Sequence, residues 1–128
     1  MSVINQLLNQ DSNCTDILEI MLDFSPLESL LYFHLIQNGE RTVVQLCKET
    51  NRKQSTVHVA LQNLVSHGIC IKKKKNKAPR GYEFAYTAKD PVVVQSILRQ
   101  RLERLYECTS KCIDTFSSKA PTCEITFN

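Results

Sequence analysis

Two helix starts of the same kind constrain how this chain can fold. Ser25-Pro26-Leu27-Glu28 places a capping hydroxyl before a proline and a glutamate at the third helical position, and Asp90-Pro91 repeats the cap and the proline. Proline is favoured at the first helical position because the amide that it lacks has no partner there, while the Ser or Asp side chain accepts bonds from the amides that follow. We therefore expect a helix from residue 26 that ends at Asn38-Gly39, and a long final helix from Val92 to about Ser117.

Two shorter helices are expected to follow the first. Thr42 precedes one at Val43–Thr50, and Asn51 is expected to cap another at about Arg52–His67, which ends at Gly68. One face of this second helix has apolar residues at helical spacing, which we expect to be buried: Val57, Ala60, Leu61, Leu64 and Val65. Its other face carries mainly hydrogen-bonding side chains: Lys53, Ser55, Thr56, His58, Val59, Gln62 and Asn63.

A β-hairpin is predicted after these helices. Apolar and polar residues alternate in Ile69–Lys73 and again in Tyr82–Thr87, and the loop between them is too long for a two-residue turn. Helix, short helix, turn, helix and hairpin is the order of a winged helix-turn-helix domain. We expect a mainly α fold with a small β-hairpin, divided into an N-terminal helical arm (1–23), the winged domain (24–89), a long dimerisation helix (90–117) and an irregular tail (118–128).

The charge of the chain is concentrated in its middle. The net charge is only +3, but residues 1–40 hold six acidic residues and neither Lys nor Arg, whereas residues 41–89 hold eleven basic and two acidic residues. A local excess of positive charge favours a polyanionic partner such as duplex DNA. The alternative is a solvated lysine face that serves solubility alone.

The candidate DNA contacts lie on the helix at 52–67 and on the hairpin. A helix in the major groove presents the side chains of its outer face to base edges. The base-edge candidates are Ser55, Thr56, His58, Val59 and Gln62, and Arg52 and Lys53 can contact either phosphate or guanine. The hairpin cations are candidates for phosphate or minor-groove contacts: Lys72, Lys73, Lys74, Lys75, Lys77 and Arg80. Because side chains alternate along a strand, some of the four consecutive lysines are expected to point away from DNA.

The final helix carries an apolar seam that suits a second helix. Its members recur at gaps of four and three residues, the spacing of a heptad repeat: Leu98, Leu102, Leu105, Thr109, Cys112 and Phe116. We expect at least the distal half to pair with a second copy in a homodimer; the alternative is that this face packs back on the domain. Cys108 and Cys112 lie four residues apart and are weak candidates for a shared metal or a redox event. With no histidine or second cysteine pair nearby, no metal site and no cofactor are predicted.

Three stretches of the sequence resemble a known family. They are Phe24–Tyr32, Asn38-Gly39 and Arg52–Ile69, and they look like parts of the winged-helix domain of archaeal TrmB-type transcription regulators and, more loosely, of the MarR group. The resemblance covers about residues 22–117 and implies a homodimeric, sequence-specific DNA-binding regulator. Because the chain ends just after the long helix, the sugar-binding domain of full-length TrmB regulators is not expected, and no effector is assigned.

Several other classes of protein are not expected. The sequence has no Walker loop, nucleophile elbow, dinucleotide fingerprint or metalloprotease helix, so we do not expect an enzyme. No apolar run approaches the roughly 18 residues of a membrane span, and no signal peptide is visible, so a soluble, cytoplasmic, nucleoid-associated protein is expected. The remaining alternative is a winged helix that acts as a protein-interaction module in a larger assembly.

Overall fold

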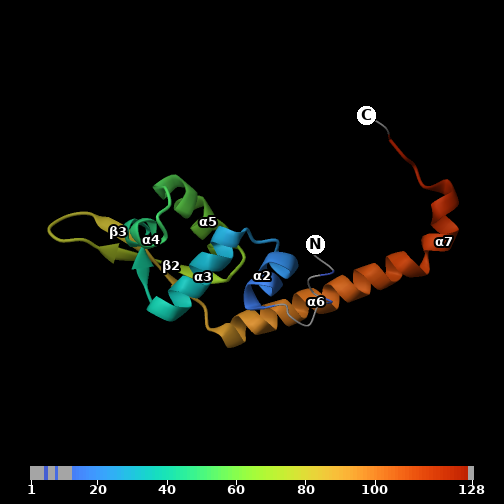
Figure 1. Ribbon diagram of the computed structural model, residues 1–128, viewed down its shortest axis with the longest axis horizontal. Coiled ribbons are helices and arrows are strands. Elements are labelled where there is room, and N and C mark those ends of the chain that lie inside the picture. Colours follow the sequence, from blue (N-terminus) through green and yellow to red (C-terminus); the bar gives the residue numbers. More distant parts are fainter. Residues whose placement is uncertain (1–4, 6–7, 9–12, 127–128) are drawn as a thin grey trace.

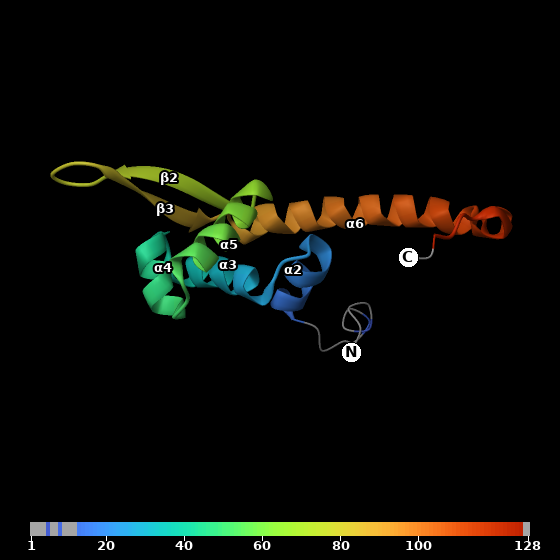
Figure 2. The same cartoon turned by 90° about the horizontal axis from the view of Figure 1, so that it is seen from above.

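The computed structural model describes residues 5, 8 and 13–126. Its elements follow in this order: α2 (Cys14–Leu22), α3 (Pro26–Asn38), β1 (Arg41–Thr42), α4 (Val43–Thr50), α5 (Gln54–Ser66), β2 (Cys70–Asn76), β3 (Tyr82–Ala88), α6 (Pro91–Asp114), α7 (Phe116–Lys119) and the 3₁₀ helix η1 (Ala120–Thr122). The hairpin of β2 and β3, here called the wing, projects from one end of the helical body, and α6 extends the other way (Figures 1 and 2). The predicted fold class is confirmed: mainly helical, with a small sheet and a long last helix.

Local capping determines where α3 and α4 begin. The Ser25 hydroxyl accepts a bond from the Glu28 amide at 3.2 Å, and the Glu28 carboxylate accepts one from the Ser25 amide at 3.0 Å. Thr42 and Gln45 form the same reciprocal pair at the start of α4. These two capping boxes satisfy amides that would otherwise lack partners in the first turn. The predicted helix starts are therefore confirmed, as is the end of α3 at Gly39, which has a φ of +82°.

The predicted start of α5 is wrong. Asn51 ends α4 in a left-handed conformation with φ 55° and ψ 47°, and its amide bonds to the Cys47 carbonyl. It therefore cannot act as the N-cap of the next helix, which begins at Gln54 after Lys53 and has no side-chain cap. Asn tolerates the left-handed region better than most residues, so it serves the turn between the two helices.

The sheet has three antiparallel strands in the order β1-β3-β2. The two residues of β1 pair with Tyr86 and Ala85, and this strand was not predicted because two residues carry no alternation pattern. The ladder between β2 and β3 runs from Cys70↔Ala88 to Asn76↔Tyr82, so both strands extend beyond the predicted ends. All four lysines of β2 therefore lie in a regular strand, so each of them points to a defined face of the hairpin.

The core brings α5 together with α2, α3, α4, the start of α6 and the strands β2 and β3. Leu31 and Leu35 of α3, Leu46 of α4, and Leu61 and Leu64 of α5 are almost completely buried. They are joined by these buried residues of α2, the segment before β2, β3 and α6: Leu18, Leu22, Ile69, Tyr86 and Val94. A helix without its own side-chain cap is thus held in place mainly by its apolar face.

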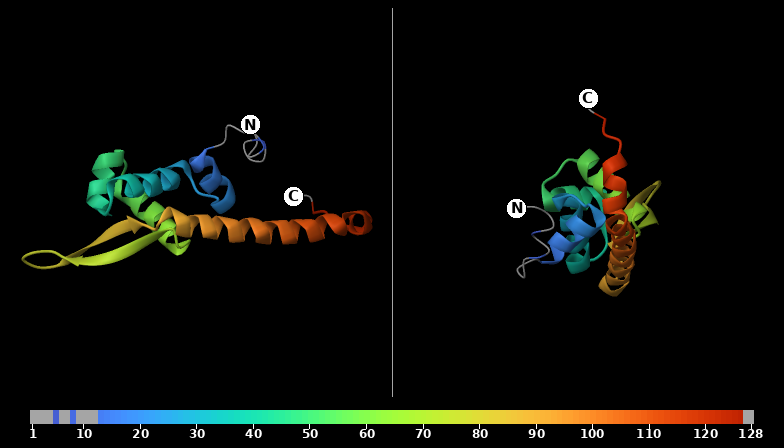
Figure 3. Two further views of the ribbon diagram at one scale, coloured as in Figure 1. Left: turned by 90° about the horizontal axis from the view of Figure 1, so that it is seen from below. Right: turned by 90° about the vertical axis from the view of Figure 1, so that its right-hand side faces the viewer.

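Only the first part of α6 contacts the body. Val94 is buried, and Ile97 and Leu98 pack partly against the core, whereas Leu102 is 45% and Leu105 is 54% exposed. Figure 3 shows α6 continuing away from the body until the chain turns into α7. No helix among residues 5, 8 and 13–126 is both long and apolar enough to cross a membrane.

The end of α6 differs from the predicted tail. The helix stops at Asp114, where the Thr115 hydroxyl donates to the Lys111 carbonyl at 3.2 Å, and short helical turns follow in part of the segment that was expected to be irregular. Phe116, expected to belong to the apolar seam, therefore lies in α7, beyond the end of α6. The heptad spacing alone did not reveal this break.

Candidate nucleic-acid interface

The outward face of α5 is centred on Ser55, Val59 and Gln62. Residues follow each other by about 100° around a helix, so these three lie opposite the buried Val57 and Leu61. All three outward residues are exposed, whereas His58 is only half-exposed and flanks them on the side of the wing, where it lines a hollow with Phe84 and other residues. Thr56 is exposed on the opposite flank, toward α3. The structure thus brings the predicted base-edge residues onto one side of α5.

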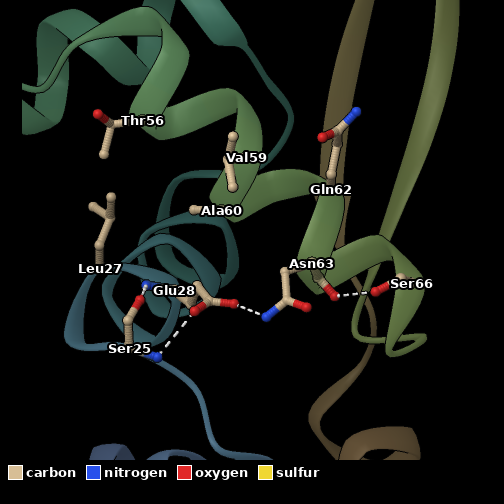
Figure 4. Close-up of a pocket in the computed structure, with 9 residues that line it drawn as sticks. All are labelled: Ser25, Leu27, Glu28, Thr56, Val59, Ala60, Gln62, Asn63 and Ser66. Atoms are coloured by element: carbon tan, nitrogen blue, oxygen red, sulfur yellow. Dashed lines mark hydrogen bonds between the residues drawn. The ribbon is translucent and has the colours of Figure 1, made fainter.

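A hollow of about 570 Å³ separates α5 from the start of α3. Figure 4 shows its lining, which consists of the N-cap residue Ser25, of Leu27 and Glu28 from α3, and of Thr56, Val59, Ala60, Gln62, Asn63 and Ser66 from α5. Glu28 is only 8% exposed. Its carboxylate accepts a bond from the Asn63 side-chain amide as well as from the Ser25 amide.

This bond between Glu28 and Asn63 removes one polar side chain from the outward face of α5. The sequence pattern places Asn63 beside Gln62 on the hydrogen-bonding face, but its amide is turned into the hollow. A buried carboxylate needs such partners, because an unpaired charge away from water is costly. Asn63 therefore joins α5 to α3, a role that only the fold reveals.

The wing presents its lysines on two different faces. Lys72 Nζ lies 4.0 Å from the centre of the Phe84 ring, and Lys74 Nζ lies 4.2 Å from the centre of the Tyr82 ring. Contacts of this kind contribute about 0.5–1 kcal/mol each at exposed sites. The two aromatic rings contact each other edge to face, with centroids 5.5 Å apart. One face of the wing therefore holds two ammonium groups at fixed positions over an aromatic pair.

The other face of the wing carries Lys73 and Lys75. Lys75 Nζ forms an ion pair with Glu40 Oε2 at 2.5 Å, next to β1. Among the residues that the structure describes, the ion pairs include Lys75 but no other lysine of β2. Lys77 and Arg80 are exposed in the loop between β2 and β3. This loop forms the far end of the wing (Figure 2). The alternation expected along this strand is present. It places Lys75, which is paired with Glu40, on the face opposite Lys72 and Lys74.

Two cations of the basic segment lie in different surroundings. Arg52 is exposed in the turn before α5, whereas Arg41 donates from Nε to Glu49 at 3.1 Å. His34 Nε2 also lies 2.5 Å from Glu49 Oε1. The hydrogen bond from His34, followed by the bond and charge of Arg41, lowers the pKa of the Glu49 carboxyl. This cluster ties α3, β1 and α4 together and leaves Arg41 engaged within the protein.

The cysteines form no metal cluster in the described part of the chain. Cys108 and Cys112 are exposed on α6, and neither belongs to a group of three or more potential ligands among residues 13–126. Cys70 is buried, and burial raises the pKa of its thiol to about 12. A protonated, buried thiol acts as a small apolar side chain rather than as a ligand.

A comparison with protein families agrees with this architecture. The sequence model of the family described as "Sugar-specific transcriptional regulator TrmB" matches residues 18–92, which extend from α2 to the start of α6. The chain belongs to the TrmB family. It is therefore a TrmB-type winged-helix regulator, in a family of transcription regulators rather than enzymes.

The relatives of this TrmB-type chain are archaeal. Uncharacterized protein MJ1082 of Methanocaldococcus jannaschii is 29% identical over 114 residues, which cover 89% of this chain and 92% of that protein. A possible transcriptional regulator from Methanosarcina mazei has the same fold, with a TM-score of 0.73 and 13% identity over 83% of this chain and 92% of its own. The ST1889 protein of Sulfolobus tokodaii matches with a TM-score of 0.61 and 12% identity, over 85% of this chain and 99% of its own.

Proposed function

We propose that this TrmB-type regulator binds duplex DNA sequence-specifically as a homodimer, with α5 in the major groove and the wing on phosphates or in the minor groove. The observation that carries the proposal is the placement of cations at the start of α5 and on the wing, none of which forms an ion pair within the part of the chain that the structure describes. Lys53 and Arg52 precede α5, and Lys72 and Lys74 occupy one face of the wing. Cations so placed contact the phosphates and orient the helix, while side chains on the helix distinguish bases.

The proposed contacts differ in what they bind and in how much they contribute to DNA affinity. Ser55, Thr56, His58, Val59 and Gln62 would face base edges, and Arg52 and Lys53 would contact phosphate or guanine. On the wing, Lys74, Lys77 and Arg80 would contribute most to phosphate binding, with Lys72 and Lys73 closer to the body. Lys75 would contribute less, because Glu40 already neutralises it.

The proposed dimer uses the part of α6 that the body leaves uncovered. Leu102, Leu105 and Tyr106 are 45%, 54% and 73% exposed, and burying them against a second helix removes apolar surface from water. Leu102 and Leu105 follow heptad spacing with Leu98, Thr109 and Cys112 within one continuous helix, and Tyr106 adjoins this seam. Two such protomers would present two α5 helices to a pseudo-palindromic site, with half-sites about one helical turn apart.

Fluorescence anisotropy on a random-sequence duplex across a salt series tests DNA binding, with light scattering on the same sample for the dimer. A dimer that neutralises roughly eight phosphates should give a slope of log K against log salt near −7. A monomer that does not bind duplex DNA at low salt would contradict the proposal. That result would favour a winged helix that contacts another protein.

A further inference from the structure

Val59 is the one apolar side chain at the centre of the otherwise polar outward face of α5. It is 63% exposed, and its neighbours on this face, Ser55 and Gln62, carry hydrogen-bonding groups. A single exposed valine needs no explanation on most surfaces. Here it occupies the middle of the face that we propose enters the major groove, so what it contacts there affects which sequence is bound.

The hollow between α5 and α3 extends the apolar surface beside Val59. Ala60 forms the adjoining wall, and the Leu27 side chain points toward α5 from the other side (Figure 4). The polar groups deeper in the hollow are already satisfied, because the Glu28 carboxylate is bonded to Asn63 and to the Ser25 amide. The free surface is therefore an apolar concavity beside Val59, with Thr56 and Gln62 at its rim.

Only one chemical group on the floor of the major groove matches such a concavity. Donors and acceptors line the edges of all four base pairs, and the apolar exception is the methyl group on C5 of thymine. A polar base edge placed against Val59 would lose its water without gaining a hydrogen-bond partner. The same methyl group is carried by 5-methylcytosine.

We propose that Val59, with Ala60 and Leu27, forms a receptor for the C5-methyl group of a pyrimidine in the bound DNA. The inference rests on the proposed DNA binding and adds the base chemistry that α5 selects. Gln62 and Thr56 at the rim then contact the polar edges next to the methyl group. A preferred site contains a thymine, or a 5-methylcytosine, at the matching position of each half-site.

The test starts from duplexes selected by the full-length protein out of a randomised library. Each thymine in a selected site is replaced in turn by deoxyuridine, which removes the methyl group and leaves the hydrogen-bonding edge unchanged. We expect one position per half-site at which this change weakens binding about fourfold, the value of burying one methyl-sized group. Cytosine and 5-methylcytosine at that position then distinguish the sources: recovery with 5-methylcytosine shows that the methyl group is read from either base, and equal binding of the two leaves thymine as the source.

Two variants locate the receptor on the protein. Val59→Ala is expected to bring the thymine-to-deoxyuridine affinity ratio close to one, and its exposed position allows the fold to persist, which a thermal unfolding curve checks. Val92→Ala, which truncates an exposed valine at the start of α6, is the matched control and should leave the ratio near four. Specific binding to the selected site with no thymine sensitive to methyl removal, or a ratio unchanged by Val59→Ala, would overturn the inference and leave the proposed function intact. Failure to bind any duplex would instead overturn the proposed function itself.

Discussion

Replacing Lys74 by alanine is expected to make duplex binding much less dependent on salt than replacing its neighbour Lys75. Lys74 Nζ lies over the Tyr82 ring and has no carboxylate partner among the described residues, whereas Lys75 is paired with Glu40 at 2.5 Å. Each phosphate contact contributes about 0.9 to the slope of log K against log salt, so losing one contact per protomer should change the slope of a dimer by about 1.8. Lys74→Ala would thus move a slope near −7 to about −5, and Lys75→Ala would leave it nearly unchanged.

The assay is anisotropy on one random-sequence duplex at four or more salt concentrations, so that only the electrostatic part of binding is compared. Glu40→Gln is the informative control, because it frees the Lys75 ammonium and removes a negative charge. It is expected to make the slope steeper. Equal slopes for the Lys74 and Lys75 variants would refute the assignment of the two wing faces.

Three further changes test the dimer and the body. Leu105→Glu places a charge on the uncovered face of α6 and is expected to convert the dimer to monomers in light scattering with little change in thermal unfolding; a dimer that persists would place the interface elsewhere. Glu28→Ala removes half of a capping box and the partner of Asn63, so it should lower the free energy of unfolding by about 1–3 kcal/mol in urea titrations, and an unchanged midpoint would show that these bonds contribute nothing. Burial raises the pKa of Cys70 from 9.0 to about 12, so the folded state holds this proton more tightly. The stability that this thiol contributes is fully present below pH 9 and is lost as the pH rises toward 12. Cys70→Ala should reduce that fall between pH 9 and about pH 12, and an identical alkaline decline would contradict a buried thiol as its source.

Local signals in the sequence located most helix ends. Ser25-Pro26 and Thr42 are each followed three residues later by Glu28 or Gln45, and the reciprocal bonds form within one turn. Such caps depend on neighbouring residues alone, so they are readable without the fold. The order of the elements then follows, and with it the winged architecture and the outward face of α5.

Features that depend on distant neighbours were missed or misassigned. Asn51 carries a side chain that could cap α5, but the turn between α4 and α5 needs a residue in the left-handed region. Asn51 takes that conformation and ends α4 instead. The Glu40–Lys75 pair and the Glu28–Asn63 bond join residues 35 positions apart in the chain. No periodicity indicates that one of four adjacent lysines is neutralised, or that an asparagine on a polar face is turned inward.

The attachment of α6 has a consequence for operator spacing. Its first turns are packed into the same core as α5 through Val94, while its far end is free. The 24 residues of α6 make a rigid rod of about 36 Å at 1.5 Å per residue. In the proposed dimer, Val94 lies about 16 Å along the helix from Leu105 in the middle of the seam. Changing the crossing of the two helices by about 10° would therefore shift each attached domain by roughly 3 Å, about one base-pair step of ~3.4 Å. The crossing angle of the two α6 helices would then set the distance between the two half-sites that the dimer can bind at the same time.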